Sequence, residues 1–194
     1  RGCFPPTGTV MSIVAPGMVE RWKADVIWYE TPKAAGGVDL ALEGGDRAEF
    51  VKGSFGLASG LKLPPSLAHP EGQTIYFKDK QGRNRPRYVV CVEQILQLPI
   101  LETVGMADEV IRVAKSFGIS PEWLCVDRTG NGQGVYDLIR YNWGPVCGVN
   151  YSEGASETRV MAEDEGTAKD MYDRAQSELW FALKSFMEFQ YCVA

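Results

Sequence analysis

The chain has 194 residues, which is enough for one domain with a substantial hydrophobic core. Hydrophobic residues make up 45% of it and charged residues 23%, a composition that excludes a disordered or fibrous chain. The net charge of −5 argues against a generally basic nucleic-acid-binding surface, although a local patch can still bind nucleic acid. No apolar run approaches the length of a membrane span, so we expect no membrane partner.

Residues 1–35 are rich in Pro and Gly, with a short helical pattern over 19–28. The first residues have neither a signal peptide nor a usual start. We interpret 1–35 as an entry segment cut from a longer protein and 36–194 as the folded domain.

From residue 37 the pattern becomes regular. Alternating or continuous apolar residues predict four strands, over 38–42, 48–57, 74–77 and 88–96, with a loop at 58–73. The period then changes to that of a helix over 104–117, with Gly118 as its stop. Beyond it we predict a strand at 123–126, a helix at 135–141, a strand at 146–149 and a long amphipathic helix at 167–189.

This order, strands first and then helices alternating with strands, predicts an α/β fold with a mixed sheet flanked by helices. It is the order of the ribonuclease H-like fold. In that fold the first strand is central and pairs in parallel with the strand that follows the first helix. We therefore expect the ends of strands 38–42 and 123–126 to lie side by side.

An aspartate stands at the end of each of these two strands, and each lies close to a glycine-rich turn. They are Asp39, before Gly44 and Gly45, and Asp127, before Gly130. Carboxylates at a strand edge suit hard divalent cations such as Mg²⁺ or Mn²⁺, and two such ions can drive phosphodiester hydrolysis.

We therefore predict two Mg²⁺ or Mn²⁺ ions, with Asp39 as the bridging ligand and Asp127 as a ligand of one ion. Asp46 is a candidate auxiliary ligand. In the alternative interpretation, an aspartate before a glycine turn only forms the turn, and Asp127 only caps the following helix.

A basic segment lies between two of the predicted strands, at residues 78–87, and is called here the basic turn. It has one negative charge and five positive charges, at Lys78, Lys80, Arg83, Arg85 and Arg87. We expect it to contact the DNA backbone near the cleavage site. A solvated hairpin tip is the alternative.

Other catalytic motifs fit poorly. The glycines after Asp127 miss the dinucleotide-binding spacing, because Val135 stands where the third glycine belongs. The chain contains no phosphate-binding loop of the common ATPase kind and no zinc-binding spacing. His69 is the only histidine, and it lies in a Pro-rich loop, which disfavours a catalytic triad.

Four stretches together resemble the C-terminal nuclease domain of the large terminase subunit, the DNA-packaging motor of tailed bacteriophages and prophages. The most specific is Val-Asp-Arg-Thr-Gly-Asn-Gly at 126–132, followed by Val-Tyr-Asp-Leu at 135–138. The others are 1–5 with 19–21, 37–41 with 44–47, and 149–151 with 172–174 and 178–181.

This resemblance implies a metal-dependent endonuclease that cuts concatemeric viral DNA during genome packaging in the host cytoplasm, at the procapsid. It implies double-stranded DNA, the portal protein and the small terminase subunit as partners, and Asp39 and Asp127 as two of three catalytic acids. The family's third acid follows the last helix and has no counterpart here. We therefore expect an absent ATPase domain, a C-terminally truncated nuclease domain and weak or no activity.

Two alternatives remain open for the function. One is another ribonuclease H-like nuclease, such as a Holliday junction resolvase, which would need a more basic surface. The other is a module that docks on DNA or on the portal without cutting. A sugar-kinase or actin-like ATP-binding fold shares the strand order, but it needs two such domains and a longer chain.

Overall fold

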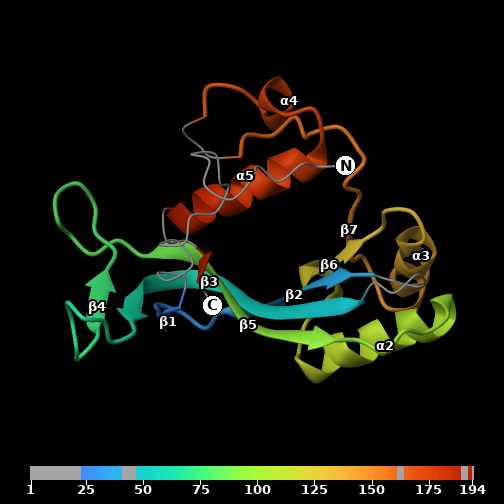
Figure 1. Ribbon diagram of the computed structural model, residues 1–194, viewed down its shortest axis with the longest axis horizontal. Coiled ribbons are helices and arrows are strands. Elements are labelled where there is room, and N and C mark those ends of the chain that lie inside the picture. The colour runs from blue at the N-terminus through green and yellow to red at the C-terminus, as the bar shows by residue number, and fades with distance from the viewer. Residues whose placement is uncertain (1–22, 41–46, 161–163, 189–191, 194) are drawn as a thin grey trace.

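The computed structural model describes residues 23–40, 47–160, 164–188 and 192–193 (Figure 1). Its strands are β1 (Asp25–Trp28), β2 (Lys33–Asp39), β3 (Glu49–Leu63), β4 (Gln73–Tyr76), β5 (Arg87–Gln97), β6 (Leu124–Asp127), β7 (Cys147–Val149) and β8 (Cys192–Val193). Its helices are α2 (Thr103–Ser116), α3 (Gly132–Asn142), α4 (Ala168–Met171) and α5 (Ala175–Glu188), with a 3-10 turn at Pro121–Trp123.

The described strands form one mixed sheet in the order β7-β6-β2-β3-β5-β8. β2, β3 and β5 are antiparallel neighbours, whereas β6 pairs in parallel with both β2 and β7. The predicted mixed α/β sheet flanked by helices is therefore present, and the strand that follows α2 lies beside β2 as expected.

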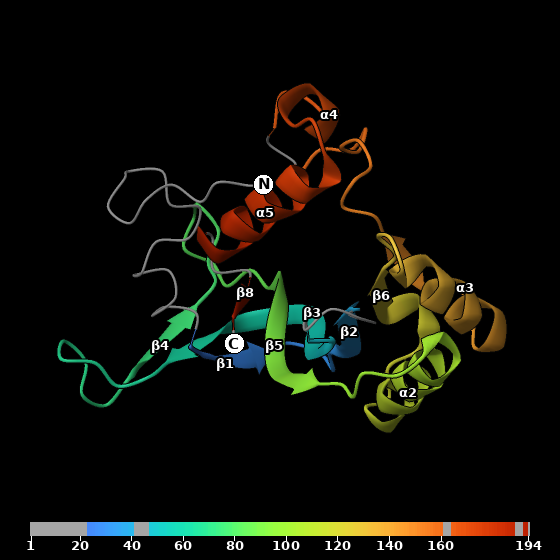
Figure 2. The ribbon, with the colours of Figure 1, turned by 45° about the vertical axis from the view of Figure 1, so that its right-hand side comes forward.

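Helices cover the sheet on both faces (Figures 1 and 2). α2 and α3 lie together on one face, where they bury the main core, while α5 crosses the other face. The core side chains come from alternate positions of the central strands and from the two helices: Val38, Phe50, Leu124, Val126, Met106, Val110, Val135 and Ile139. Residues next to these core positions along a strand, such as Asp39 and Cys125, point the opposite way and therefore lie on the face that α5 crosses.

β3 is the longest strand, and four other strands pair with it. Its first half pairs with β2 and β5, and its second half with β1 and β4. An irregularity after Lys52 leaves Glu93 of β5 as an extra residue, and the Glu93 carboxylate accepts hydrogen bonds from Lys52 and Ser54. β3 continues to Leu63, so its last residues occupy part of the predicted loop at 58–73.

The helix predicted over 19–28 is wrong where the chain is described, because residues 25–28 form β1 instead. Val26 and Ile27 are β-branched and pair with Leu61 and Gly60 of β3. Residues 33–35 also belong to β2, so the predicted start of the folded domain at residue 36 falls inside that strand. Residues 19–22 of the predicted helix lie outside the described ranges.

The single helix predicted over 167–189 is also wrong, because the chain breaks between α4 and α5. Tyr172 is extended, with φ −133° and ψ 140°. Thr167 and Asp170 form a capping box at the start of α4, five residues before Tyr172. The Ala175 N–H donates to the Glu153 carbonyl over 2.9 Å, which ties the start of α5 to the segment after β7. Tertiary contacts of this kind are invisible to helical periodicity.

The strand predicted over 38–42 corresponds to β2, which begins earlier, at Lys33, and ends at Asp39, while residues 41–42 lie outside the described ranges. The remaining predicted elements each have a counterpart. α2 ends where expected, and Gly118 adopts the left-handed conformation, with φ 67°, that favours glycine. Among the described helices, none is both long and apolar enough to cross a bilayer.

Candidate functional site

Asp39 and Asp127 end two adjacent parallel strands. Val38 pairs with Val126 in the parallel ladder of β2 and β6, and each aspartate is the next residue. Because side chains alternate along a strand, both carboxylates point away from the face on which Val38 and Val126 are buried. The two aspartates, called here the carboxylate pair, are therefore neighbours on the α5 side of the sheet.

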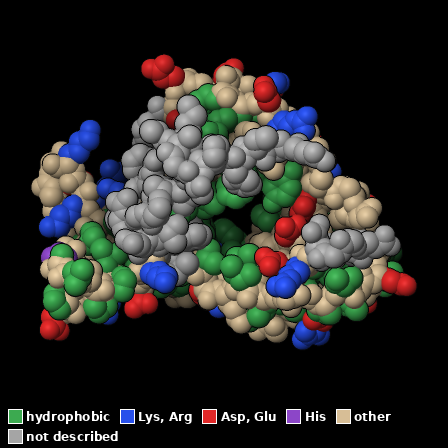
Figure 3. Space-filling view, viewed as in Figure 1, with side chains coloured by type: hydrophobic (Ala, Val, Ile, Leu, Met, Phe, Trp, Pro, Cys, Tyr) green, Lys and Arg blue, Asp and Glu red, His purple; other side chains and the backbone are tan. Residues whose placement is uncertain are grey.

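This side of the sheet is open to solvent near the carboxylate pair. Asp39 is exposed and Asp127 is half-buried. Figure 3 shows a hollow between α5 and the sheet, with acidic and hydrophobic side chains at its rim. Glu49 of β3 pairs with Asp39, which adds a third carboxylate to the same edge.

The Asp127 side chain is held by the turn that follows it. Its Oδ1 accepts the Thr129 N–H over 2.8 Å, so Asp127 does form the turn, as the alternative interpretation expects. It does not cap α3, whose N-cap position is occupied by Asn131. The bond to Thr129 fixes the carboxylate and leaves Oδ2 for a ligand.

A tyrosine lies next to the carboxylate pair. Asp127 pairs with Val149 of β7, and Tyr151 stands two residues further on. The Tyr151 N–H donates to Thr129 Oγ1 over 3.1 Å. Partial burial and the negative charges of Asp127 and Asp39 raise the pKa of the Tyr151 phenol.

Contacts from the turn after β6 hold the turn after β7 in place. The Arg128 guanidinium donates to the Glu153 carboxylate over 2.5 Å and lies over the Tyr136 ring, while the Arg128 N–H donates to the Val149 carbonyl. Asn150 donates to the same Glu153 carboxylate. These contacts make the two turns one unit beside the carboxylate pair.

Two glycines allow this close packing. A Cβ on Gly132 would lie 2.4 Å from the Asp127 carbonyl oxygen, and one on Gly148 would lie 2.7 Å from the Tyr136 ring. Sequence reasoning identified the glycine-rich turn, but not Thr129 or Tyr151 as members of the site. Tyr151 could have been considered from the sequence, because it comes just after the strand predicted at 146–149, which follows the Asp127 turn.

The carboxylate pair fits part of a site for a hard divalent cation. Mg²⁺ and Mn²⁺ are commonly held by one or two carboxylates, with waters and substrate oxygens completing the shell. Within the described ranges, no group of three or more His, Cys, Asp or Glu side chains is arranged to hold a metal ion. Asp46, the predicted auxiliary ligand, lies outside those ranges.

Comparison with models of protein families, with curated proteins and with solved structures finds no match for this chain.

The basic turn lies at the other end of β3 from the carboxylate pair (Figure 1). Phe77, at its base, donates its N–H to the Ser59 carbonyl, whereas Asp39 pairs with Glu49. Ser59 follows Glu49 by ten positions along β3, a span of up to about 33 Å. From the sequence we expected the basic turn to lie near the carboxylates. It lies instead at the opposite end of β3.

Asp79 organises the basic turn from within. Its carboxylate accepts the N–H groups of Gln81 and Arg83 and pairs with the Arg83 guanidinium over 2.8 Å, and these bonds lower the pKa of Asp79. The Arg87 guanidinium lies over the Phe77 ring and donates to the Lys78 carbonyl. Lys78, Lys80, Arg83 and Arg85 are exposed.

Two cysteines lie side by side near the carboxylate pair, two residues before Asp127 on β6 and two residues before Val149 on β7. Cys125 of β6 and Cys147 of β7 are register partners and are both free thiols. Loss of hydration, with the charge and hydrogen bond of Cys147, raises the pKa of Cys125 to about 12. Cys125 therefore remains a thiol at neutral pH and is a poor nucleophile.

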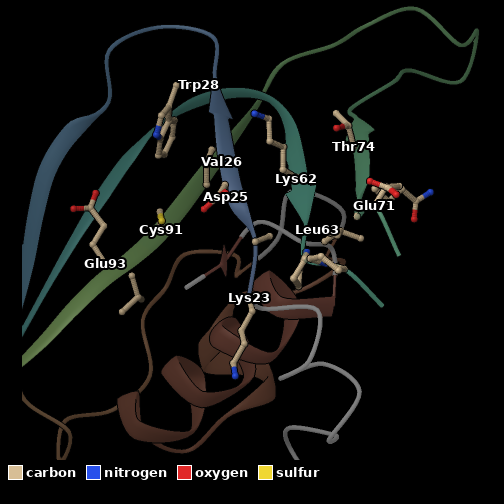
Figure 4. Close-up of a pocket in the computed structure, with 16 residues that line it drawn as sticks. Lys23, Asp25, Val26, Trp28, Lys62, Leu63, Glu71, Thr74, Cys91 and Glu93 are labelled. Atoms are coloured by element: carbon tan, nitrogen blue, oxygen red, sulfur yellow. The ribbon is translucent and has the colours of Figure 1, made fainter. Parts of the chain in front are cut away.

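A cavity of about 690 Å³ opens at a distance from the carboxylate pair, between β1, the end of β3 and β4. Figure 4 shows Lys23, Asp25, Lys62, Glu71 and Glu93 around it. Its lining contains side chains of both charge signs.

Proposed function

We propose that this chain is the nuclease domain of a metal-dependent DNA endonuclease with a ribonuclease H-like fold. One observation carries the proposal: Asp39 and Asp127 end adjacent parallel strands and lie on the same open face of the sheet. The order β5-β3-β2-β6-β7, with β2 and β6 parallel, agrees with the strand arrangement expected for that fold.

The two aspartates would hold Mg²⁺ or Mn²⁺ through their carboxylate oxygens. A bound pair of such ions supplies charge neutralisation for the phosphate and an activated water. Asp39, the more exposed of the two, suits the shared position, while Thr129 holds the Asp127 carboxylate in one orientation.

The resemblance to the terminase nuclease domain supplies the proposed substrate and setting. The substrate is double-stranded concatemeric viral DNA, cut at the procapsid in the host cytoplasm. The proposed partners are the portal protein and the small terminase subunit. The Asp127 turn, the most specific part of the resemblance, lies at the centre of the site.

The test is nicking of supercoiled plasmid by the full chain in Mn²⁺, Mg²⁺ or EDTA. We expect weak metal-dependent nicking that Asp39→Asn and Asp127→Asn reduce to the level seen in EDTA, because each substitution removes a charged metal ligand. Asp108→Asn is the matched control, since Asp108 is exposed on α2, on the other face of the sheet.

Equal nicking by all four proteins would reject the proposal. If none of them nicks DNA but all bind it, the chain is the non-catalytic docking module. A preference for four-way junctions over linear duplex would instead favour a junction resolvase.

A further inference from the structure

The end of β7 brings a third kind of side chain to the carboxylate pair. Tyr151 is anchored by its backbone, because its N–H donates to Thr129 Oγ1 over 3.1 Å. Thr129 in turn donates its own N–H to Asp127 Oδ1. Thr129 thus hydrogen-bonds to both Asp127 and Tyr151.

The Tyr151 phenol is not needed to hold this turn together. The turn is already tied by the Arg128–Glu153 ion pair and by the hydrogen bond from Ser152 N–H to the Asn150 side chain. Within the described part of the chain, Tyr151 bonds through its backbone rather than its hydroxyl. The side chain remains 38% exposed, so solvent and a ligand can reach it.

The chemistry of the phenol limits what it can do. A tyrosine hydroxyl is protonated at neutral pH and can donate a hydrogen bond. A donor beside two carboxylates suits a ligand that is itself an acceptor. A phosphodiester held at the same edge has the unprotonated oxygens that such a donor needs.

We propose that Tyr151 contacts the DNA at this site by donating its hydroxyl to a phosphate oxygen of the strand held at Asp39 and Asp127. Thr129 is the positioning residue that holds Tyr151 and Asp127 in register. This inference rests on the proposed nuclease function and assigns a substrate contact within it.

The experiment compares the full chain with Tyr151→Phe, which removes only the hydroxyl. Plasmid cleavage is measured with Mn²⁺, and binding of a fluorescein-labelled duplex of about 20 base pairs is measured with Ca²⁺ in its place. We expect kcat/KM to fall about tenfold or more and duplex binding to weaken about threefold to tenfold. Tyr141→Phe, at an exposed tyrosine on α3, is the matched control and should change neither.

Thr129 is tested by a pair of substitutions. Thr129→Val keeps the shape but removes the acceptor for the Tyr151 N–H, whereas Thr129→Ser keeps it. We expect Thr129→Val to lower kcat with little change in KM. We expect Thr129→Ser to keep kcat near that of the unaltered chain. Equal loss in both variants would overturn the positioning role.

The two assays separate failure of the contact from failure of the nuclease. If Asp39→Asn abolishes cleavage while Tyr151→Phe cleaves and binds like the unaltered chain, the contact is rejected and the nuclease stands. If the unaltered chain does not cleave, the nuclease proposal fails and binding alone decides on Tyr151. Weaker binding by Tyr151→Phe then supports the contact, and unchanged or absent binding rejects it.

Discussion

Gly132 sits where the chain passes from β6 into α3, and the backbone there leaves no room for a side chain. Its missing Cβ would lie 2.4 Å from the Asp127 carbonyl oxygen, an atom that cannot move without moving β6. Gly37, on the neighbouring strand, differs, because a Cβ there would have no heavy atom within 4 Å. Two glycines near the same site therefore have opposite tolerances.

We predict that Gly132→Ala lowers the free energy of unfolding by about 1–3 kcal/mol, since the added methyl group must displace backbone. Gly37→Ala should leave it unchanged or raise it by up to about 1 kcal/mol, because alanine is less flexible in the unfolded chain. Urea unfolding followed by circular dichroism measures both. Similar losses in the two variants would contradict the close packing at Gly132.

At the scale of elements, α5 is attached to the sheet by a small apolar contact. Met187 is buried against Val90 and Val92 of β5, with Leu183 and Phe186 beside it. Leu179, two turns earlier on the same helix, is 42% exposed. The C-terminal half of α5 thus contributes most of the packing.

We predict that Met187→Ala destabilises the protein by about 2 kcal/mol, near the lower end for a buried methionine because the cluster is small. Leu179→Ala should cost less than about 1 kcal/mol. The two midpoints of thermal unfolding provide the comparison. A cost for Leu179→Ala equal to that of Met187→Ala would mean that α5 packs along its whole length.

Local patterns predicted the elements whose neighbours lie close in sequence. α2 and β5 carry clear apolar periods, and Gly118 marks the end of α2, so their existence followed from sequence. β1 did not, because four residues become a strand only when β3 pairs with them. The break at Tyr172 depends likewise on contacts between α5 and the segment after β7.

The candidate site was predictable only in part. Two aspartates at strand ends could be placed together once the strand order was inferred. Thr129 and Tyr151 could not, since their roles depend on one hydrogen bond between turns that are 22 residues apart in sequence. The location of the basic turn also required the length of β3, which the sequence pattern underestimated.

At the scale of the whole molecule, the basic turn and the carboxylate pair lie at opposite ends of β3. A duplex rises about 3.4 Å per base pair, so only DNA longer than about 10 base pairs can reach both. A shorter duplex can occupy one end alone.

We predict that the double substitution Lys80→Ala and Arg85→Ala weakens binding of a duplex of about 20 base pairs but not of one of about 8. The salt dependence should also fall, by about 0.9 in the slope of log K for each phosphate that the protein no longer neutralises. Fluorescence anisotropy at several salt concentrations measures both effects. Arg112→Ala with Arg140→Ala removes the same charge from α2 and α3 and serves as the control.

Equal weakening for both duplex lengths would place the basic turn and the carboxylates at one binding surface. No weakening for either would favour the alternative interpretation, in which the basic turn is a solvated loop held by Asp79.

The parallel pairing of β2 with β6 also sets the order in which the chain can assemble. β3 meets β2 and β5 through near neighbours in sequence, but the two aspartates come together only when a loop of about ninety residues closes. We therefore expect the amides of β6 to gain protection from hydrogen exchange after those of β3 during refolding. Simultaneous protection would show a single concerted step; a delay would mean that the two aspartates are brought together last, after most of the sheet has formed.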